Sequence, residues 1–190
     1  MNVELTSTDL GNPAEQRTLV AFRLDQQTYA LHIEPIVQII EMVTIMPIPQ
    51  ISNRVEGVIN VRGAPVPVVN LRRYLGLPEA ALQLHTPIIL AQVSELMVGL
   101  IVDEVLDVLN LPGGQIAHPA EILPEGLGEA PILQGLAHTP DGMVLLLDLE
   151  HLFLPHQAQA LAQAVETLPE AVVRGAPEQH LDEPDREVGT

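Results

Sequence analysis

The stretch GVINVRGAPVPVVNLRRYLGL, residues 57–77, decides the fold, because two prolines interrupt a valine-rich run that otherwise favours a β-strand. Backbone donors two residues apart in a strand point to the same side. Pro65 and Pro67 therefore remove two donors from one edge and leave the other edge able to pair. Gly63 suits a tight turn between the two apolar runs. The stretch predicts a β-hairpin with one edge protected against further pairing.

Two more hairpins are predicted on either side of this stretch. TLVAFRL (18–24) is followed by the turn signal DQQT and by YALHI (29–33). TPIILAQV (86–93) is followed by SE and by LMVGLIV (96–102). Short aliphatic runs separated by turn residues are typical of an all-β barrel or sandwich.

An internal repeat refines this prediction. Without gaps, residues 57–75 lie over 135–153, and residues 29–40 lie over 98–109. The matched pairs include Gly57 with Gly135, Asn70 with Asp148, Leu71 with Leu149, Ile36 with Val105, Gln38 with Asp107 and Ile39 with Val108. Two matches in the same chain order predict two similar small barrels in tandem. Each would contain a hairpin, a short crossover segment and a glycine-led final pair of strands.

Composition limits the possible functions. The chain has 190 residues, 47% of them hydrophobic, which is enough for one domain of good size or two small ones. With two Phe, two Tyr and no Trp, the core must be mainly aliphatic. A formal net charge of −17 argues against non-specific binding to nucleic acid or anionic membranes. The absence of cysteine excludes disulfides and thiolate sites, and the lack of a signal peptide or membrane-spanning run predicts a cytoplasmic protein.

The layout predicts one folded region between two tails. Residues 1–16 read as a disordered N-terminal tail, and 155–190 as an acidic, proline-containing C-terminal tail that is partly helical or disordered. Within it, the helix formers of 157–168 favour one helical segment. The folded region, 17–154, would hold two intertwined small barrels with short helical segments.

Signatures of catalysis are missing from the sequence. The only serines, Ser7, Ser52 and Ser94, lie outside any GxSxG setting, and no glycine-rich phosphate-binding motif occurs. The histidines are not in HExxH spacing, and the cluster Asp103, Glu104 and Asp107 lacks the alternating oxygens of a calcium loop. That cluster is predicted to be a solvated face. We expect no enzyme, no cofactor and no metal site.

The arginines are unevenly distributed. There is no lysine, and four of the eight arginines, Arg54, Arg62, Arg72 and Arg73, fall within 20 residues. Arg72 and Arg73 follow a predicted strand and are expected to have structural roles on a solvated face. Arg62 lies in the apolar run INVRGA, where a guanidinium needs a carboxylate, carbonyl groups or a partner. It is the best single functional candidate.

Together these motifs resemble those of CheW, the adaptor family of bacterial chemosensory arrays. The similarity covers residues 17–153 and rests on YALHIEPI, on GVINVRGAPVPVVNLRRYLGLP, on VGLIVDEVLDVL and on GMVLLLDLEHLF. It implies two five-stranded SH3-like barrels without catalysis. It also implies binding to the regulatory domain of a CheA-type histidine kinase and to the cytoplasmic helical tip of a chemoreceptor, at arrays on the inner face of the membrane. Gln38, Asn70 and Pro65 depart from the family pattern.

The resemblance also implies site residues. The kinase-binding surface would include Ile36, Gln38, Ile39 and Gly57, and the receptor-binding groove would include Arg62, Ile88, Gly99, Val105 and Val108. A helical turn would place Val105 and Val108 on one face, although both valines could equally be core residues. Two alternatives remain. One is an adaptor of a type IV pilus or other non-flagellar pathway. The other is a ligand-binding barrel for a peptide or oligosaccharide, which the scarcity of aromatic residues disfavours.

Overall fold

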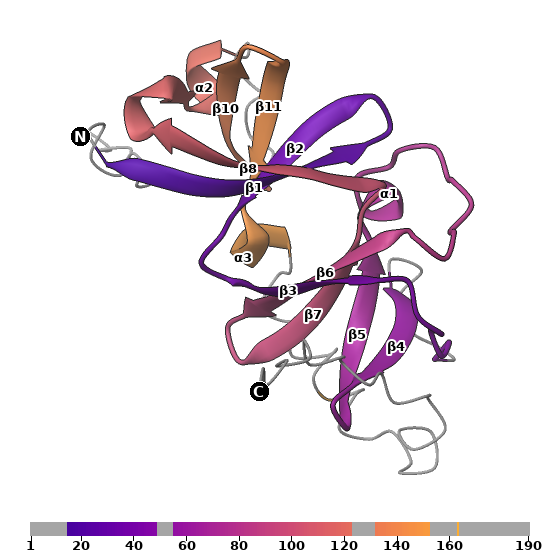
Figure 1. Ribbon diagram of the computed structural model, residues 1–190. Coiled ribbons are helices and arrows are strands. Elements are labelled where there is room, and N and C mark those ends of the chain that lie inside the picture. Colours follow the sequence, from indigo (N-terminus) through magenta and orange to yellow (C-terminus); the bar gives the residue numbers. More distant parts are fainter. Residues whose placement is uncertain (1–14, 49–54, 123–131, 153–162, 164–190) are drawn as a thin grey trace, which may run out of the picture.

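The computed structural model describes residues 15–48, 55–122, 132–152 and 163, and these residues form two packed β-sheets (Figure 1). In sheet A the strands are ordered β8-β1-β2-β11-β10-β9, and in sheet B β3-β6-β7-β5-β4. The bounds in sheet A are β1 Gln16–Leu24, β2 Gln27–His32, β8 Glu104–Pro112, β9 Ile116–Ala117, β10 Leu133–Thr139 and β11 Gly142–Leu147. Those in sheet B are β3 Ile36–Glu41, β4 Val55–Val61, β5 Ala64–Asn70, β6 Pro87–Val93 and β7 Leu96–Ile101.

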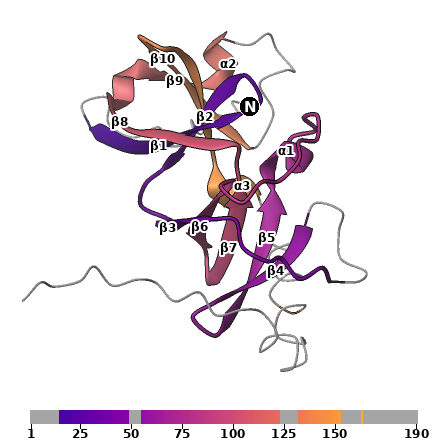
Figure 2. The ribbon, with the colours of Figure 1, turned by 45° about the vertical axis from the view of Figure 1, so that its right-hand side comes forward.

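Short helices follow β5 of sheet B and β11 of sheet A. The helical elements are α1 Leu71–Tyr74, α2 Pro119–Ile122, α3 Leu149–Leu152 and a 3₁₀ turn at Gly113–Gln115. Helix α3 lies between the two sheets (Figure 2), and the Tyr74 hydroxyl of α1 donates a hydrogen bond to the Leu152 carbonyl of α3. The predicted all-β fold of two small barrels with short helical segments is confirmed.

The composition of each barrel differs from the prediction. The hairpin β1-β2 lies in sheet A, but the next strand, β3, pairs with β6 in sheet B. Likewise the hairpin β6-β7 lies in sheet B, and the next strand, β8, pairs with β1 in sheet A. Each barrel therefore takes its hairpin from one half of the repeat and its crossover strand and final pair from the other half, so that β1-β2 join β8 and β10-β11, and β6-β7 join β3 and β4-β5. The prediction that these three parts follow one another along the chain in each barrel was wrong. The short links between β2 and β3 and between β7 and β8 carry each strand to the other sheet.

Local geometry supports the internal repeat. Bulges occur between Val55 and Gly57 in β4 and between Leu133 and Gly135 in β10. The β1-β2 and β6-β7 turns each contain a residue with positive φ, Asp25 at 56° and Ser94 at 51°. The repeat therefore holds for turns and bulges as well as for strands.

The apolar residues form three cores. One lies inside each barrel, and the largest lies between the barrels, with residues from both sheets. Along β6, Ile88 and Leu90 point into barrel B, whereas Ile89, Ala91 and Val93 join the core between the barrels. Both faces of this strand are buried, which explains why its sequence is continuously aliphatic instead of alternating.

The opening stretch forms the β4-β5 hairpin. Its two-residue turn is Arg62-Gly63, with φ of 53° and 85°, as expected for a type I′ turn. This turn makes Val61 and Ala64 a hydrogen-bonded pair, so Pro65 and Pro67 fall in the alternate pairs and their nitrogens face away from β4. On that side β7 pairs with β5 only from Val68 onward. The edge of β5 that faces β4 pairs, as predicted. The opposite edge is blocked only at the prolines themselves, and the prediction that it would take no further strand was wrong, because β7 pairs with β5 from Val68 onward.

The predicted tails and the helix at 157–168 lie outside the described residues, apart from Glu15, Gln16 and Gln163. In the part of the chain that is described, no helix has both the length and the apolar character needed to cross a membrane.

Candidate functional site

Strand β3 carries the first of two exposed apolar faces. It is the edge strand of sheet B, and its residues alternate between half-buried and exposed. Val37 is 57% exposed and Ile39 is 41% exposed, whereas Ile36 packs against the core between the barrels. Val37 is the extra residue of a bulge between Ile36 and Gln38, which gives the edge a local twist. We call Val37 and Ile39 the β3 face.

Strand β8 carries the second face at the equivalent place in the repeat. It is the edge strand of sheet A, with Leu106 40% exposed and Val108 46% exposed. The register with β1 shifts beside them, so a bulge recurs at the matching position. The Val108 amide donates to the Asp107 carboxylate, which occupies one backbone donor of β8. We call Leu106 and Val108 the β8 face. The chain thus presents two matching apolar edge strands, one on each barrel.

The expected helical turn at Val105 and Val108 is not formed. Both residues lie in strand β8, where Val105 packs against the core between the barrels and Val108 is exposed. The bulge in β8 pairs Val105 with Phe22 and Val108 with Val20, which lie two residues apart on β1, so both valines are on the same face of sheet A. Val105 is half-buried against the core and Val108 is exposed beside it.

Ile88 and Gly99 are not exposed in the groove between the barrels. Ile88 is fully buried inside barrel B, and a Cβ atom at Gly99 would lie 3.0 Å from the Ile88 Cγ2 atom. These neighbours on β6 and β7 fill the barrel interior. The prediction that they line a surface groove was wrong, because both faces of the β6-β7 hairpin are covered.

Gly57 is also buried. Its backbone has φ of 153°, and a Cβ atom there would lie 2.1 Å from the Met46 carbonyl oxygen. The Met46 and Val58 backbones exchange hydrogen bonds of 2.8 Å, which join the segment after β3 to β4. Because Gly57 has no side chain, the segment around Met46 can approach β4 closely enough to form these hydrogen bonds. Gly57 therefore has a structural role in closing the barrel.

Arg62 is exposed at the tip of the β4-β5 hairpin and does not lie within a strand. Among the described residues it forms no hydrogen bond or ion pair. Its guanidinium is therefore available at the surface. Gln38, by contrast, is half-buried between Val37 and Ile39.

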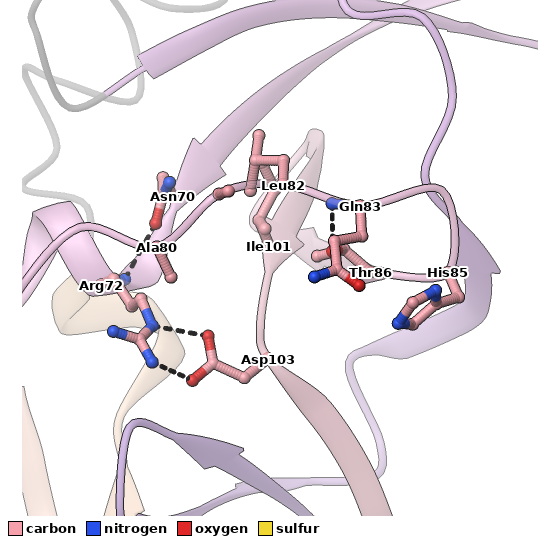
Figure 3. A pocket seen from close by; sticks show the side chains of 10 residues that line it. Asn70, Arg72, Ala80, Leu82, Gln83, His85, Thr86, Ile101 and Asp103 are labelled. Carbon is pink, nitrogen blue, oxygen red and sulfur yellow. Dashed lines mark hydrogen bonds and ion pairs between the residues drawn. The ribbon is translucent and has the colours of Figure 1, made fainter.

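Arg72 makes a two-point ion pair with Asp103 near the junction of the barrels (Figure 3). Its Nε and Nη2 atoms each lie 2.6 Å from an oxygen of Asp103, which receives a third hydrogen bond of 2.6 Å from the Asp25 amide. Arg72 also lies 3.6 Å from the Asp25 carboxylate. Because Asp25 is in the β1-β2 turn of barrel A and Arg72 follows β5 of barrel B, this cluster holds the barrels together.

Electrostatics agree with this geometry. Burial alone would raise the pKa of the Asp103 carboxyl, but hydrogen bonds from Arg72 and the Asp25 amide, with attraction to Arg72 and Arg23, lower that pKa. The hydrogen bond to Asp103 raises the pKa of Arg72. Sequence reasoning missed this pair. The prediction of a solvated face was wrong for Asp103, and the available signal was an arginine placed directly after an apolar strand.

Asn70 has two structural tasks at the start of α1. Its Oδ1 atom accepts hydrogen bonds from the amides of Arg72 and Arg73, and its Nδ2 atom donates to Glu56 at 3.0 Å. In the repeat, Asp148 caps α3 through the amides of Glu150 and His151. An amide in place of the carboxylate lets the first cap donate to a neighbouring acid, which explains this departure from the family pattern.

We expect Asn70→Ala to lower the free energy of unfolding by about 1–2 kcal/mol, because the cap and the bond to Glu56 are both lost. Asp148→Ala, which removes only a cap, is the matched control and is expected to cost about 1 kcal/mol. Urea denaturation followed by circular dichroism measures both. An unchanged midpoint for Asn70→Ala would show that water replaces both interactions.

Within the described ranges, no group of His, Asp and Glu side chains is arranged to hold a metal ion. A small cavity of about 270 Å³ lies beside Arg72 and Asp103, and its arginine is already paired within the chain (Figure 3). Among the described residues, the two strand faces each bring two exposed apolar side chains together on one strand.

Comparisons with known proteins agree with this description. A family model for the CheW-like domain matches residues 18–154. Chemotaxis protein CheW of Thermotoga maritima is 31% identical over 141 residues, covering 74% of this chain and 90% of that protein. The crystal structure of scaffolding protein TtCheW from Thermoanaerobacter tengcongensis has a TM-score of 0.68 and 28% identity, covering 76% of this chain and 97% of that chain. Protein PilI of Pseudomonas aeruginosa is a weaker relative, 25% identical over 158 residues, with 80% and 82% covered. The chain belongs to the CheW-like family and is a chemotaxis adaptor.

Proposed function

We propose that this adaptor binds a CheA-type histidine kinase through the β3 face and a chemoreceptor helix through the β8 face, in arrays at the inner side of the membrane. The observation that carries the proposal is the pair of equivalent apolar edge strands, one on each barrel. Exposed apolar side chains beside a rigid core are suited to burial against a partner.

The proposed mechanism is geometric. The two faces belong to barrels that share one core and exchange strands, so a partner on one face has a fixed position relative to a partner on the other. A conformational change in the receptor would then be transmitted to the kinase through a rigid connector. This task needs no catalytic residue. Arg62, exposed on barrel B, would add a charge at the rim of the receptor contact.

The test compares Ile39→Asp with Val108→Asp. A carboxylate buried in an apolar interface has no partner, so each substitution is expected to weaken one partner by about 100-fold, a few kcal/mol. Ile39→Asp should weaken binding to the kinase regulatory domain, and Val108→Asp binding to a receptor cytoplasmic fragment. Isothermal titration with each purified partner measures the affinities, and circular dichroism monitors the fold.

Leu84→Asp is the matched control, because Leu84 is an exposed leucine outside both strand faces. It should leave both affinities unchanged. If Val108→Asp weakens both partners equally while the protein stays folded, the assignment of one partner to each face is wrong.

A second candidate is the same adaptor role in a type IV pilus or other non-flagellar chemosensory pathway, which the similarity to Protein PilI supports. Both candidates use the same strand faces. Titration of the protein with the regulatory domains of the flagellar and pilus-linked kinases of one host distinguishes them, since the cognate kinase should bind more tightly.

A further inference from the structure

The internal repeat creates two equivalent pockets where the barrels meet. The first, beside α1, includes Arg72 and Asp103. The second, beside α3, has a volume of about 580 Å³, compared with about 270 Å³ for the first. In the second pocket Glu150 takes the position of Arg72, and Glu34 takes the position of Asp103. We call this larger cavity the α3 pocket.

The first pocket is lined by one arginine, Arg72, and a second arginine, Arg23, forms an ion pair at the same corner of the fold. Arg72 binds Asp103 through two hydrogen bonds, and Arg23 forms an ion pair with Glu104. Each arginine and its acid come from separate elements, so both pairs tie the corner between β7 and β8 to a neighbouring segment. This half of the molecule supplies its own cations.

Neither arginine has a basic residue at the equivalent position in the α3 pocket. Glu150 stands in place of Arg72, and Gln92 stands in place of Arg23. The anion equivalent to Asp103 is kept as Glu34, and Ser94, which replaces Asp25, retains the positive φ of the turn. Among the described residues, the site therefore keeps the positive-φ turn and the acid of the first corner but has no arginine.

The groups that face the cavity leave it negative. Asp148 lies 2.8 Å from the Nδ1 atom of His151 and is largely buried, while Glu34 and Glu150 are exposed at its rim. His32 contacts Gln134 at 3.0 Å and lies 3.9 Å from Glu34. With histidine counted as neutral, the formal charge of the residues that line this cavity comes from three carboxylates, Glu34, Asp148 and Glu150.

We propose that the α3 pocket binds an arginine side chain of a partner protein, whose guanidinium occupies the place equivalent to that of Arg72. Three observations carry this inference: the cavity is twice as large, the acid that paired the arginine is kept as Glu34, and the equivalent pocket shows a guanidinium bound in the same frame. A planar guanidinium can donate hydrogen bonds to two carboxylates at once, and a lysine ammonium does this less well. The site is separate from both strand faces.

The experiment titrates the full chain, labelled with ¹⁵N, with the peptide acetyl-Gly-Arg-Gly-amide and follows the amide signals by NMR. Saturable shifts are expected at Glu34, Ser94 and Glu150. The same peptide with citrulline, which has the shape of arginine without its charge, should bind at least tenfold more weakly. This test uses neither kinase nor receptor, so its result is independent of the proposed function.

Glu150→Arg restores an internal cation at the position equivalent to Arg72 and should weaken the arginine peptide at least tenfold. Asp141→Arg makes the same charge change in the exposed β10-β11 turn and should leave binding unchanged. Glu34→Gln is a second variant, which removes only the kept acid and should weaken binding several-fold. Equal binding of the citrulline peptide, or equal losses in Glu150→Arg and Asp141→Arg, would overturn the proposal.

Discussion

Gly57→Ala is expected to lower the free energy of unfolding by about 3–5 kcal/mol, a larger loss than Gly63→Ala or Gly135→Ala would cause. The new Cβ atom would lie 2.1 Å from the Met46 carbonyl oxygen, and backbone has to move to relieve that contact. The φ of 153° adds strain for any residue with a side chain. Urea denaturation at neutral pH, followed by circular dichroism, measures the loss.

Two glycines provide graded controls. Gly63→Ala, in the β4-β5 turn, meets no atom within 4 Å and has only the strain of φ 85°, about 1 kcal/mol. Gly135→Ala, at the equivalent bulge, meets the Ile116 Cγ2 atom at 2.5 Å, and that side chain can partly move. The expected order of destabilisation is Gly57, then Gly135, then Gly63. A Gly57→Ala protein as stable as Gly63→Ala would mean that the segment around Met46 shifts at little cost.

Arg72→Ala is expected to lower the free energy of unfolding by about 2–4 kcal/mol, because it leaves the Asp103 carboxylate without its charged partner between the barrels. The Arg72 side chain is only 14% exposed and the Asp103 side chain is 26% exposed, so hydration of the Asp103 carboxylate offsets the lost ion pair only in part. The double variant Arg72→Leu with Asp103→Leu should be more stable than Arg72→Ala, since no unpaired charge remains. Chemical denaturation of both proteins at pH 7 tests this order.

The same pair predicts a pH dependence. The pKa of Asp103 is lowered in the folded protein, so the pair contributes its full stability above the pKa of the unfolded chain, about 4. That contribution is lost as the pH falls through the lowered folded-state value. Unfolding free energies measured from pH 6 down to pH 3 should therefore fall less steeply for Asp103→Asn than for the unchanged protein. Parallel curves would show that Asp103 has the same pKa in both states.

Local patterns were sufficient to predict much of the fold. The two-residue turn at Arg62 and Gly63, the blocked edge at Pro65 and Pro67, and the pairing of Gly57 with Gly135 all depend on residues close in sequence. Backbone preferences act over such short ranges, so a sequence pattern can reveal them.

Long-range placement could not be predicted in the same way. Ile88 and Gly99 were expected in a groove, yet a strand buried on both faces has no alternation that assigns each residue to a barrel interior or to the core between barrels. Arg72 and Asp103 are 31 residues apart, and no local rule joins them. Which strands share a sheet depends on the crossovers after β2 and β7, and the repeat alone is compatible with either pairing.

The exchange of the hairpins β1-β2 and β6-β7 between the halves of the repeat makes the molecule a single-chain counterpart of a domain-swapped dimer. Neither half of the repeat contains all the strands of a closed barrel, so a cut in the loop between α1 and β6 would yield two fragments that each need the other to fold. The halves must therefore gain or lose their structure together. For a scaffold, this means that a load applied to β8 passes along one continuous chain into β7 of the opposite barrel, with no hinge at which the two halves could come apart.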